Sequence, residues 1–311
     1  MICVAICTRQ RPEMLRRMLN SCANVTSELR KELIFLVIEN GPPEHAEAIV
    51  DEFKDRLRIK YLNEPAIGLV NARNTAIESF LETDAEWYAS VDDDGAISTD
   101  WAAGYLDAIA TFPEAQAFAG PTPQVELENA TKWYQRTEPP VLPLGREHWN
   151  VSTANVLFRR DLLSPDGKNL RFDHRYNLSG GEDTQFFRRL LKMGIPILWV
   201  PTAVILERVD EKRGEFKNRV RRSIQFAQNR GKIVFDEYGL IGGVAVNVFQ
   251  STLFLFNALV SVIVGGIVFI FSKKYGYKLI SNGVRMYCIA FGRLKSVFTK
   301  RASYYSVTDG N

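Results

Sequence analysis

Short apolar runs alternate with stretches of helical spacing through the first hundred residues of the chain. The runs at 2–6, 33–38, 58–62 and 87–91 are rich in residues that favour β-strands. Between them, the segments 14–22, 45–53 and 68–81 carry apolar residues at helical spacing. This repeated order of strand, turn and helix predicts an α/β fold with a parallel sheet and crossover helices.

The pattern is less regular after residue 100. It predicts helices at 100–110 and 183–193 and strands at 115–119, 154–158 and 197–200. The stretch 121–149 is rich in loops and carries Trp133, Tyr134 and Trp149. Loops of this length within a compact domain are usually functional or disordered, so these aromatic residues are candidates for a binding role.

Polar clusters follow three of the predicted strands. They lie at 8–11, 39–41 and 92–94. Ligands of parallel α/β sheets bind beyond the carboxyl ends of the strands. The sequence therefore predicts a binding site where these three clusters meet.

The last hundred residues have a different composition. Residues 211–232 are strongly basic, the segment 240–272 contains no charged side chain, and Lys273, Lys274 and Lys278 follow it. At about 1.5 Å per residue the uncharged segment is long enough to cross a bilayer. Residues 284–298 mix apolar and basic side chains, which is typical of an amphipathic helix at a membrane interface.

The basic flanks on both sides of this segment bear on its topology. The positive-inside rule favours keeping both flanks in the cytosol, and a single crossing would separate them. A hairpin or an interfacial layer would keep both beside the catalytic domain. A hydrophobic helix buried against the domain is the remaining alternative.

Composition narrows the class of protein. The 311 residues are 46% hydrophobic and 24% charged, which excludes bulk disorder. The net charge of +3 does not indicate a particular class of partner, and no nucleic-acid partner is expected. The four cysteines have no CxxC spacing, which fits a reducing compartment; they are Cys3, Cys7, Cys22 and Cys288. The three histidines lack the spacing of metal ligands; they are His45, His148 and His174. The apolar stretch at the N-terminus is too short for a signal peptide, so the N-terminal domain is expected in the cytosol.

Three adjacent aspartates, Asp92, Asp93 and Asp94, are the sharpest chemical feature. Clustered carboxylates repel one another and favour a neutralising cation. Hard oxygen ligands suit Mg²⁺ or Mn²⁺, which in turn can hold a diphosphate. A solvated acidic turn or a helix cap is the simpler interpretation of the same residues.

Two further features are ambiguous when taken alone. Glu182 and Asp183 follow a Gly-Gly pair and begin an amphipathic segment, so they are either helix-capping residues or a positioned general base. Arg73 is either a surface arginine or a ligand for diphosphate oxygens. Thr8 and Arg9, after the first strand, are equally ambiguous.

Taken together, these pieces resemble the family 2 glycosyltransferases. They are Cys7-Thr8-Arg9-Gln10-Arg11-Pro12 after the first strand, Glu39-Asn40-Gly41, Gly68 through Asn74, Asp92-Asp93-Asp94 and Gly181-Glu182-Asp183. They occur in the family's order and cover roughly residues 1–207. The resemblance implies a Rossmann-like, mixed but mostly parallel sheet of the glycosyltransferase A type. The composition of residues 211–311 adds a helical membrane-associated segment after it.

The resemblance also implies a role for each matched residue. Nucleotide-sugar binding would fall to Thr8, Arg9, Glu39, Asn40, Arg73, Asp92 and Asp93. Asp94 would be the main metal ligand, assisted by Asp92. Asp183 would be the catalytic base, and Glu182 would help to place the acceptor. The second strand ends in Glu39 where the family usually has aspartate, which weakens the inference that the base is uracil.

The implied reaction is an inverting transfer. A divalent cation, Mn²⁺ or Mg²⁺, would stabilise the leaving nucleoside diphosphate, and the donor would be a UDP-sugar. The acceptor would be a lipid-linked saccharide, reached at the cytoplasmic face of the inner membrane. A nucleotidyltransferase would be expected to carry a glycine-rich loop after strand one, which is missing here. A catalytically inactive, membrane-tethered binding subunit would not need Asp94 and Asp183.

We therefore expect two regions. Residues 1–210 would form the catalytic domain, with a nucleotide-binding half at 1–98 and an acceptor half at 99–210. Residues 211–311 would form a basic, helical region that associates with the membrane through 240–311.

Overall fold

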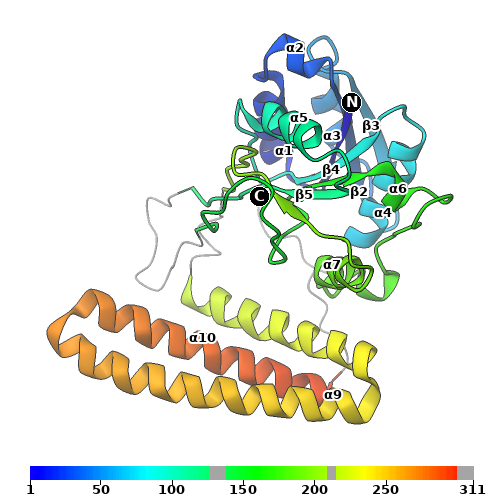
Figure 1. Cartoon of the computed structure of the whole chain (residues 1–311). Coiled ribbons are helices and arrows are strands. Elements are labelled where there is room, and N and C mark those ends of the chain that lie inside the picture. The colour runs from blue at the N-terminus through cyan, green and yellow to red at the C-terminus, as the bar shows by residue number, and fades with distance from the viewer. Residues whose placement is uncertain (126–137, 209–214, 300–311) are drawn as a thin grey trace.

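The computed structural model describes residues 1–125, 138–208 and 215–299 (Figure 1). Trp133 and Tyr134, two aromatic residues of the loop proposed for binding, lie outside the described residues. The predicted domain boundary at residue 210 also lies outside them.

A seven-stranded sheet forms the centre of the N-terminal domain, with the strand order β3-β2-β1-β4-β6-β5-β7. The strands are β1 Ile2–Thr8, β2 Leu33–Asn40, β3 Ile59–Glu64, β4 Trp87–Asp92, β5 Ala117–Ala119, β6 Asn155–Arg159 and β7 Leu198–Trp199. The first four run parallel, whereas β6 is antiparallel to both β4 and β5. The predicted α/β fold with a mixed, mostly parallel sheet is therefore confirmed.

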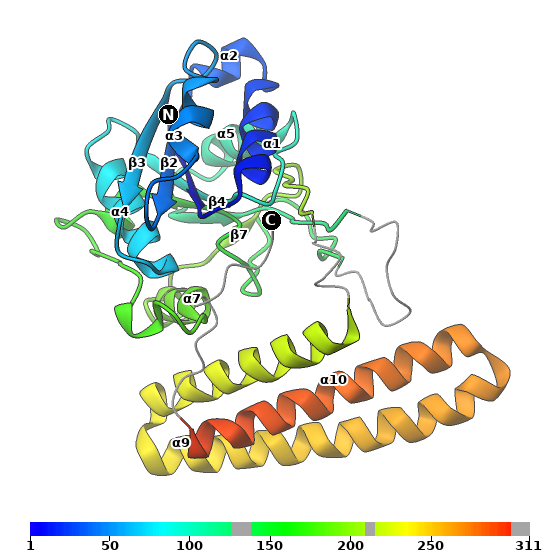
Figure 2. The ribbon, with the colours of Figure 1, turned by 180° about the vertical axis from the view of Figure 1, so that it is seen from behind.

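Helices cover both faces of the sheet and enclose two apolar cores (Figures 1 and 2). Side chains along β1 alternate between the cores: Ile2, Val4 and Ile6 face one, Cys3 and Ala5 the other. The first core is covered by α1 Pro12–Ala23, α3 Ala46–Asp51 and α5 Trp101–Thr111. The second is covered by α4 Leu69–Leu81, α6 Arg160–Leu163 and α7 Glu182–Lys192. Two short elements complete the domain: α2 Ser27–Arg30 and η1 His174–Tyr176.

Buried Asn155 fixes the antiparallel strand β6 in this sheet. Its carboxamide oxygen accepts hydrogen bonds from Trp101 Nε1 at 3.0 Å and Tyr105 Oη at 2.9 Å. Its nitrogen donates to the carbonyl oxygens of Pro121 and Ala203. One polar side chain thus joins β6 to α5 and to the loops beyond β5 and β7.

Two long helices follow the sheet domain. They are α9 Phe216–Phe271 and α10 Lys273–Phe298. Gly239 interrupts α9 with a backbone conformation (φ 67°, ψ −171°) that favours glycine. We refer to residues 216–238 as the first arm of α9 and to residues 240–271 as its second arm. In Figures 1 and 2 the first arm lies next to the sheet domain, α10 lies below it and the second arm lies farthest away.

The first arm packs firmly on the sheet domain. Ile233 belongs to the second apolar core. Arg188 on α7 forms an ion pair with Glu237 at 2.5 Å, and Asn229 donates a hydrogen bond to the carbonyl oxygen of Ser179. The sequence predicted this stretch as part of a basic, helical region, and from Phe216 onward it is helical. The uncharged segment and the amphipathic tail are helical as expected, although the tail helix begins at Lys273 rather than near residue 284.

Candidate active site

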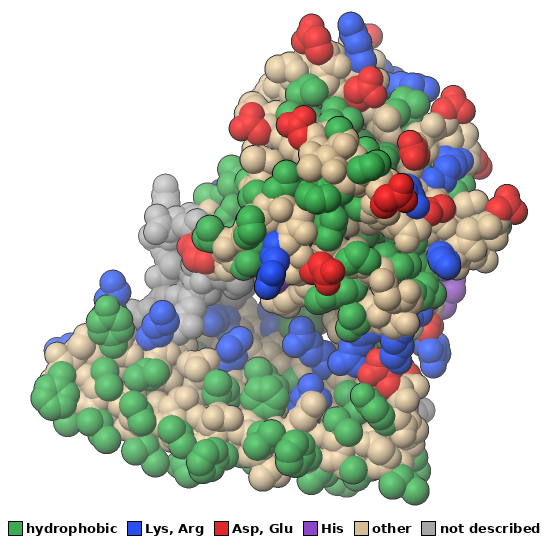
Figure 3. Space-filling model, viewed as in Figure 1, with side chains coloured by type: hydrophobic (Ala, Val, Ile, Leu, Met, Phe, Trp, Pro, Cys, Tyr) green, Lys and Arg blue, Asp and Glu red, His purple; other side chains and the backbone are tan. Residues whose placement is uncertain are grey.

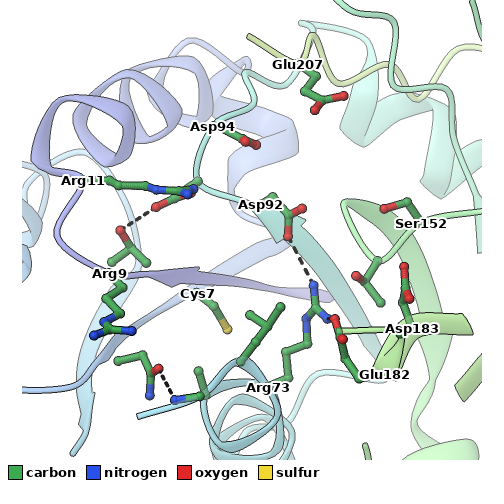
Figure 4. A pocket seen from close by; sticks show the side chains of 18 of the residues that line it. Cys7, Arg9, Arg11, Arg73, Asp92, Asp94, Ser152, Glu182, Asp183 and Glu207 are labelled. Carbon is green, nitrogen blue, oxygen red and sulfur yellow. Dashed lines mark hydrogen bonds and ion pairs between the residues drawn. The ribbon is translucent and has the colours of Figure 1, made fainter. Parts of the chain in front are cut away.

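A cavity of about 300 Å³ lies at the carboxyl ends of β1 and β4, where the sequence predicts a site (Figure 4). Of the site residues predicted from sequence, all but Glu39 line it: Thr8, Arg9, Asn40, Arg73, Asp92, Asp93, Asp94, Glu182 and Asp183. The structure therefore brings together residues from Thr8 to Asp183, which are far apart in the chain.

Asp93 ties the loop after β1 to the end of β4. Its carboxylate accepts hydrogen bonds from Thr8 Oγ1 at 2.7 Å and from Arg11 Nη1 at 3.1 Å. Burial raises the pKa of Asp93 to about 6, with Asp94 and Asp92 adding to the effect of burial and Arg11 opposing it. The middle aspartate of the cluster thus fixes the two loops, and Asp92 and Asp94 are the pair that face the cavity (Figure 4).

Asp92 and Asp94 differ in their surroundings. The side chain of Asp92 is 42% exposed but lies within the recess, where Arg73 Nη2 is 3.6 Å from its Oδ1. Its pKa is raised because burial disfavours the charged form, and Asp94 and Asp183 add negative charge while Arg73 opposes the shift. Asp94 is 8% exposed, and its carbonyl oxygen accepts from Arg17 Nη2 at 2.7 Å.

The two residues at the end of β2 hold loops in place. Glu39 Oε1 accepts from the backbone N–H groups of Glu44, His45 and Ala46 at the start of α3, and Oε2 accepts from Tyr61 Oη at 2.7 Å. Its carboxylate therefore caps a helix and does not line the main cavity.

Asn40 acts on the next loop. Its carboxamide oxygen accepts from Gly68 N at 2.8 Å, and its nitrogen donates to the carbonyl oxygen of Ala66 at 2.9 Å. Although Asn40 lines the cavity, its polar atoms fix the turn that leads into α4.

The start of α4 is fixed from the other half of the domain. Asn177 Oδ1 accepts from the N–H groups of Val70 at 3.1 Å and Asn71 at 3.2 Å. A Cβ at position 68 would lie 2.1 Å from this carboxamide oxygen, and Gly68 has φ +136°. Only glycine therefore permits both the turn and the cap.

Arg73 projects from α4 into the floor of the cavity and is 4% exposed. Its Nη1 is 2.5 Å from Glu182 Oε1 on α7, and its guanidinium lies 5.4 Å from the ring centroid of Phe172. Figure 4 shows the guanidinium between Asp92 and Glu182. The side chain thus links the predicted nucleotide-binding half to the predicted acceptor half.

The two acidic residues that begin α7 have different environments. Glu182 is 3% exposed, and burial raises its pKa to about 7, opposed by Arg73 and reinforced by Asp183. Asp183 is half-buried, lines the cavity, and accepts from Thr184 N at 2.5 Å through Oδ1. Of the two carboxylates, Asp183 is the one placed to meet a substrate.

Several lining residues were given no role from the sequence, although Arg11 belongs to the polar cluster at 8–11. They are Arg11, Ser152, Thr153, Glu207, Arg222 and Phe226. Arg222 and Phe226 come from the first arm of α9, one helical turn apart, with the guanidinium 5.7 Å from the ring centroid. The basic composition of 211–232 was the only signal in the sequence, and it pointed to a membrane instead of this cavity.

The cavity suits a cation that binds together with a phosphate. Among the residues that the structure describes, no three His, Cys, Asp or Glu side chains gather as metal ligands. Asp92 and Asp94 nevertheless offer hard oxygen ligands that line the same cavity as Asp183, and a cation held there would offset the negative charge that these side chains bring together. Mg²⁺ is commonly held by one or two carboxylates, with water and substrate phosphates completing its shell.

Comparison with known proteins gives a consistent match. Residues 3–175 match the sequence model of glycosyl transferase family 2. The chain is 29% identical over 240 residues to the succinoglycan biosynthesis protein ExoM of Rhizobium meliloti, which covers 75% of each chain. The family match favours the predicted glycosyltransferase over a nucleotidyltransferase.

Two solved structures share the fold at low sequence identity. A mannosyltransferase from Pyrobaculum calidifontis, in complex with GDP-Man and Mn²⁺, is 15% identical, with a TM-score of 0.60 over 94% of this chain and 86% of that one. S. aureus TarS 1-349, in complex with UDP-GlcNAc, is 16% identical, with a TM-score of 0.54 over 75% of this chain. The match spans 66% of that TarS chain, just under two thirds of its length.

The environment of Glu182 makes the stability of the apo protein depend on pH. Its pKa rises from 4.5 in the unfolded chain to about 7 in the folded protein, so the folded state holds the proton more tightly. The contribution of Glu182 to stability is therefore fully present below pH 4.5 and is lost as the pH rises to about 7, a change of roughly 3 kcal/mol. Glu182→Gln should remove that part of the decline in thermal unfolding profiles and leave the parts due to Asp92 and Asp93, whose pKa values are also raised.

The matched control is Glu47→Gln on the exposed face of α3, which should leave the profile unchanged. If Glu182→Gln kept the full decline, the assigned environment of Glu182 would be wrong.

Proposed function

The chain belongs to glycosyl transferase family 2, and we propose that it transfers a sugar, with inversion, from a UDP-sugar to a hydroxyl of a lipid-linked saccharide in polysaccharide biosynthesis. One observation carries the proposal. Asp183 faces the same cavity as Asp92 and Asp94, with Arg73 between the two halves of the site. The relatives support the substrate class, since one is a succinoglycan biosynthesis protein and two solved structures hold nucleotide-sugars.

The proposed mechanism is a single displacement. Asp183 accepts the proton of the acceptor hydroxyl, whose oxygen forms a bond to the anomeric carbon of the sugar. The bond from that carbon to the diphosphate oxygen breaks, and the electron pair leaves with the nucleoside diphosphate. Attack from the face opposite the leaving group inverts the anomeric centre. A divalent cation held by Asp92 and Asp94 would neutralise the charge of the departing diphosphate.

The remaining residues position these groups. Thr8 and Asp93 hold the loops around the nucleotide site through their mutual hydrogen bond, and Asn40 and Glu39 fix the turns beside them. We assign the nucleotide contacts to Arg9 and to the rims of these loops. We assign to Glu182 the task of holding Arg73 at 2.5 Å, which also sets the first turn of α7 and therefore Asp183.

We further propose that the catalytic unit extends to residue 238. The first arm of α9 supplies Arg222 and Phe226 to the cavity and Ile233 to a core of the domain. A boundary at residue 210 would remove these side chains from the unit.

Asp183→Asn tests the assignment of the base. The variant should keep its fold and bind UDP with Mn²⁺ as the wild type does, while sugar transfer falls by about 10²–10⁴-fold. Transfer is measured as UDP release in the presence of acceptor, and binding by isothermal titration calorimetry.

Asp166→Asn makes the same chemical change on an exposed loop and should be active. Near-normal transfer by Asp183→Asn would show that another group takes the proton.

Asp94→Asn tests the metal site. Loss of one charged ligand should lower transfer by about 100-fold, and excess EDTA should do the same to the wild type, with Mn²⁺ or Mg²⁺ restoring activity. Since two carboxylates make an incomplete shell, calorimetry should also show tighter Mn²⁺ binding in the presence of UDP.

Asp107→Asn on the exposed side of α5 is the matched control and should keep its metal response. Full turnover in excess EDTA would exclude a metal from the mechanism.

We place the enzyme at the cytoplasmic face of the inner membrane. Among the residues that the structure describes, one helix, α9, is long and apolar enough to cross a membrane. The mean hydropathy of its most apolar window is 2.6, and 11% of that window is buried. The full-length protein should therefore sediment with membranes and resist a high-salt wash, and a reporter fused after Asn311 should be cytosolic. Recovery of the full-length protein in the soluble fraction would contradict this location.

A further inference from the structure

The helices that follow the sheet domain form a stack in which the number of charged side chains falls with distance from that domain. The first arm of α9 lies next to the domain and carries Lys217, Arg219, Arg221, Arg222, Arg230, Lys232, Asp236 and Glu237. The middle helix, α10, carries only basic charges: Lys273, Lys274, Lys278, Arg285, Arg293 and Lys295. The outermost helix, the second arm of α9, carries none.

The first arm lies along α10 over most of its length. Phe216, Val220 and Ser223 share a small pocket with Ser281, Val284 and Cys288. Further along, a Cβ at position 292 would lie 2.4 Å from the carbonyl oxygen of Ile224. A Cβ at Gly231 would likewise lie 2.3 Å from the hydroxyl oxygen of Ser296. The two helices thus run in the same direction and are in contact from Phe216 to Gly231 of the first arm.

Small and polar residues hold α10 against the second arm. A Cβ at Gly283 would lie 2.9 Å from the carbonyl oxygen of Ala258, and one at Gly276 would lie 2.5 Å from the Cα of Phe269. Ser251 Oγ donates to the carbonyl oxygen of Ala290 at 3.2 Å. These close approaches show that α10 and the second arm are tightly packed, so their separation would lose that packing.

Buried Asn247 joins all three helices of the stack. Its nitrogen donates to the carbonyl oxygen of Gly231 in the first arm at 3.0 Å, and its oxygen accepts from Arg293 Nη1 in α10 at 3.1 Å. The two arms and α10 are therefore joined by one buried polar side chain.

One stripe of the second arm points away from this packing. Phe249, Phe256, Ile263 and Ile270 recur every seven residues and are 64%, 64%, 54% and 79% exposed. The buried residues Ser251, Ala258 and Gly265 lie two positions after members of this stripe, about 200° around the helix. The stripe therefore faces away from α10. In Figure 3 apolar side chains cover this outer part of the stack, and Lys and Arg side chains gather at its seam with the sheet domain.

This arrangement is incompatible with α9 crossing the bilayer perpendicular to its plane. The first arm lies alongside α10 and α10 alongside the second arm, so all three would enter the membrane together. The cations of the first arm and Arg285 and Arg293 of α10 would then lie at hydrocarbon depth, where each charge costs about 2.5–3.5 kcal/mol. The sheet domain, which is fixed to the first arm, would have to follow.

We propose that the stack lies in the plane of the membrane on one leaflet of an anionic bilayer. The second arm is embedded at the boundary of the hydrocarbon, α10 lies at the level of the headgroups, and the first arm stands above them. The axes of packed helices are about 8–10 Å apart. This spacing is similar to the depth of about 5–10 Å to which an interfacial helix is buried, so each helix of the stack would lie in a different layer. The proposal rests on the proposed membrane location of the enzyme and gives its orientation.

The orientation also defines how an acceptor reaches the site. Arg222 and Phe226 of the first arm form one wall of the cavity that contains Asp183. With the stack in the membrane plane, this wall stands directly above the headgroups. The site then fits an acceptor whose saccharide is joined to its lipid by a short polar link, so that the lipid stays in the leaflet during transfer.

Depth measurements along the outer stripe test the orientation. Single cysteines replace Phe249, Phe256, Ile263 and Ile270 in turn, each labelled with an environment-sensitive fluorophore in the full-length protein bound to vesicles of phosphatidylcholine and phosphatidylglycerol. Lipids spin-labelled at shallow or deep positions of the chain serve as quenchers. All four labels should be quenched more by the shallow probe and to a similar extent. A depth that changes steadily along the series, with a label at the bilayer centre, would overturn the proposal.

Vesicle binding gives a second test that does not depend on labelling. Ile263→Asp places a charge on the outer stripe and should weaken partition into these vesicles at least about tenfold. Leu191→Asp makes the matched change at an exposed site of the sheet domain, where Leu191 is 51% exposed, and should leave partition unchanged. Equal effects of the two substitutions would contradict the proposed face.

Both tests can be repeated in Asp183→Asn, which should give wild-type depth and partition. A wrong assignment of the catalytic base would change the transfer assay and leave these results intact. A wrong orientation would change the depth profile and leave the transfer assay intact.

Discussion

The buried guanidinium of Arg73 is the interaction on which the site depends. A charge removed from water is costly unless it is paired, and Arg73 is paired with Glu182 at 2.5 Å and with Asp92 at 3.6 Å. These partners come from α7 and from the end of β4, so any shift of either element leaves a buried charge without its partner. Asp183 follows Glu182 directly, and its place in the cavity is therefore set by a residue of the opposite half of the domain.

The polar residues around the cavity fall into two groups with different tasks. One group forms hydrogen bonds with loops and helix starts of the protein itself: Asp93, Glu39, Asn40 and Asn177. Asp92, Asp94 and Asp183 face the open volume. Because the first group fixes the backbone in advance, the second group need not reorganise when a charged substrate arrives, which is the condition for effective electrostatic stabilisation.

The sequence predicted the parts of the molecule that depend on local pattern. Strands such as β1 and β2 are continuous apolar runs, and the ends of parallel strands meet at one edge, so the cavity and most of its acidic residues could be predicted. The capping role of Glu39 could not, because it depends on how the chain returns at residues 44–46. Nor could Arg222 and Phe226, since their place in the cavity depends on how the first arm of α9 docks on α7. The antiparallel placement of β6 likewise rests on contacts of Asn155 with segments distant in the sequence.

The interruption of α9 at Gly239 has a consequence for how proteins of this architecture can diversify. The first arm before it lines the cavity and the second arm after it carries the apolar stripe, while α10 packs against both arms. A chimera joined at Gly239 would keep residues Arg222 and Phe226 in the cavity wall and exchange the apolar stripe. It would also have to reproduce the contacts of α10 with the first arm at Gly292 and Ser296, because the wall rests on them.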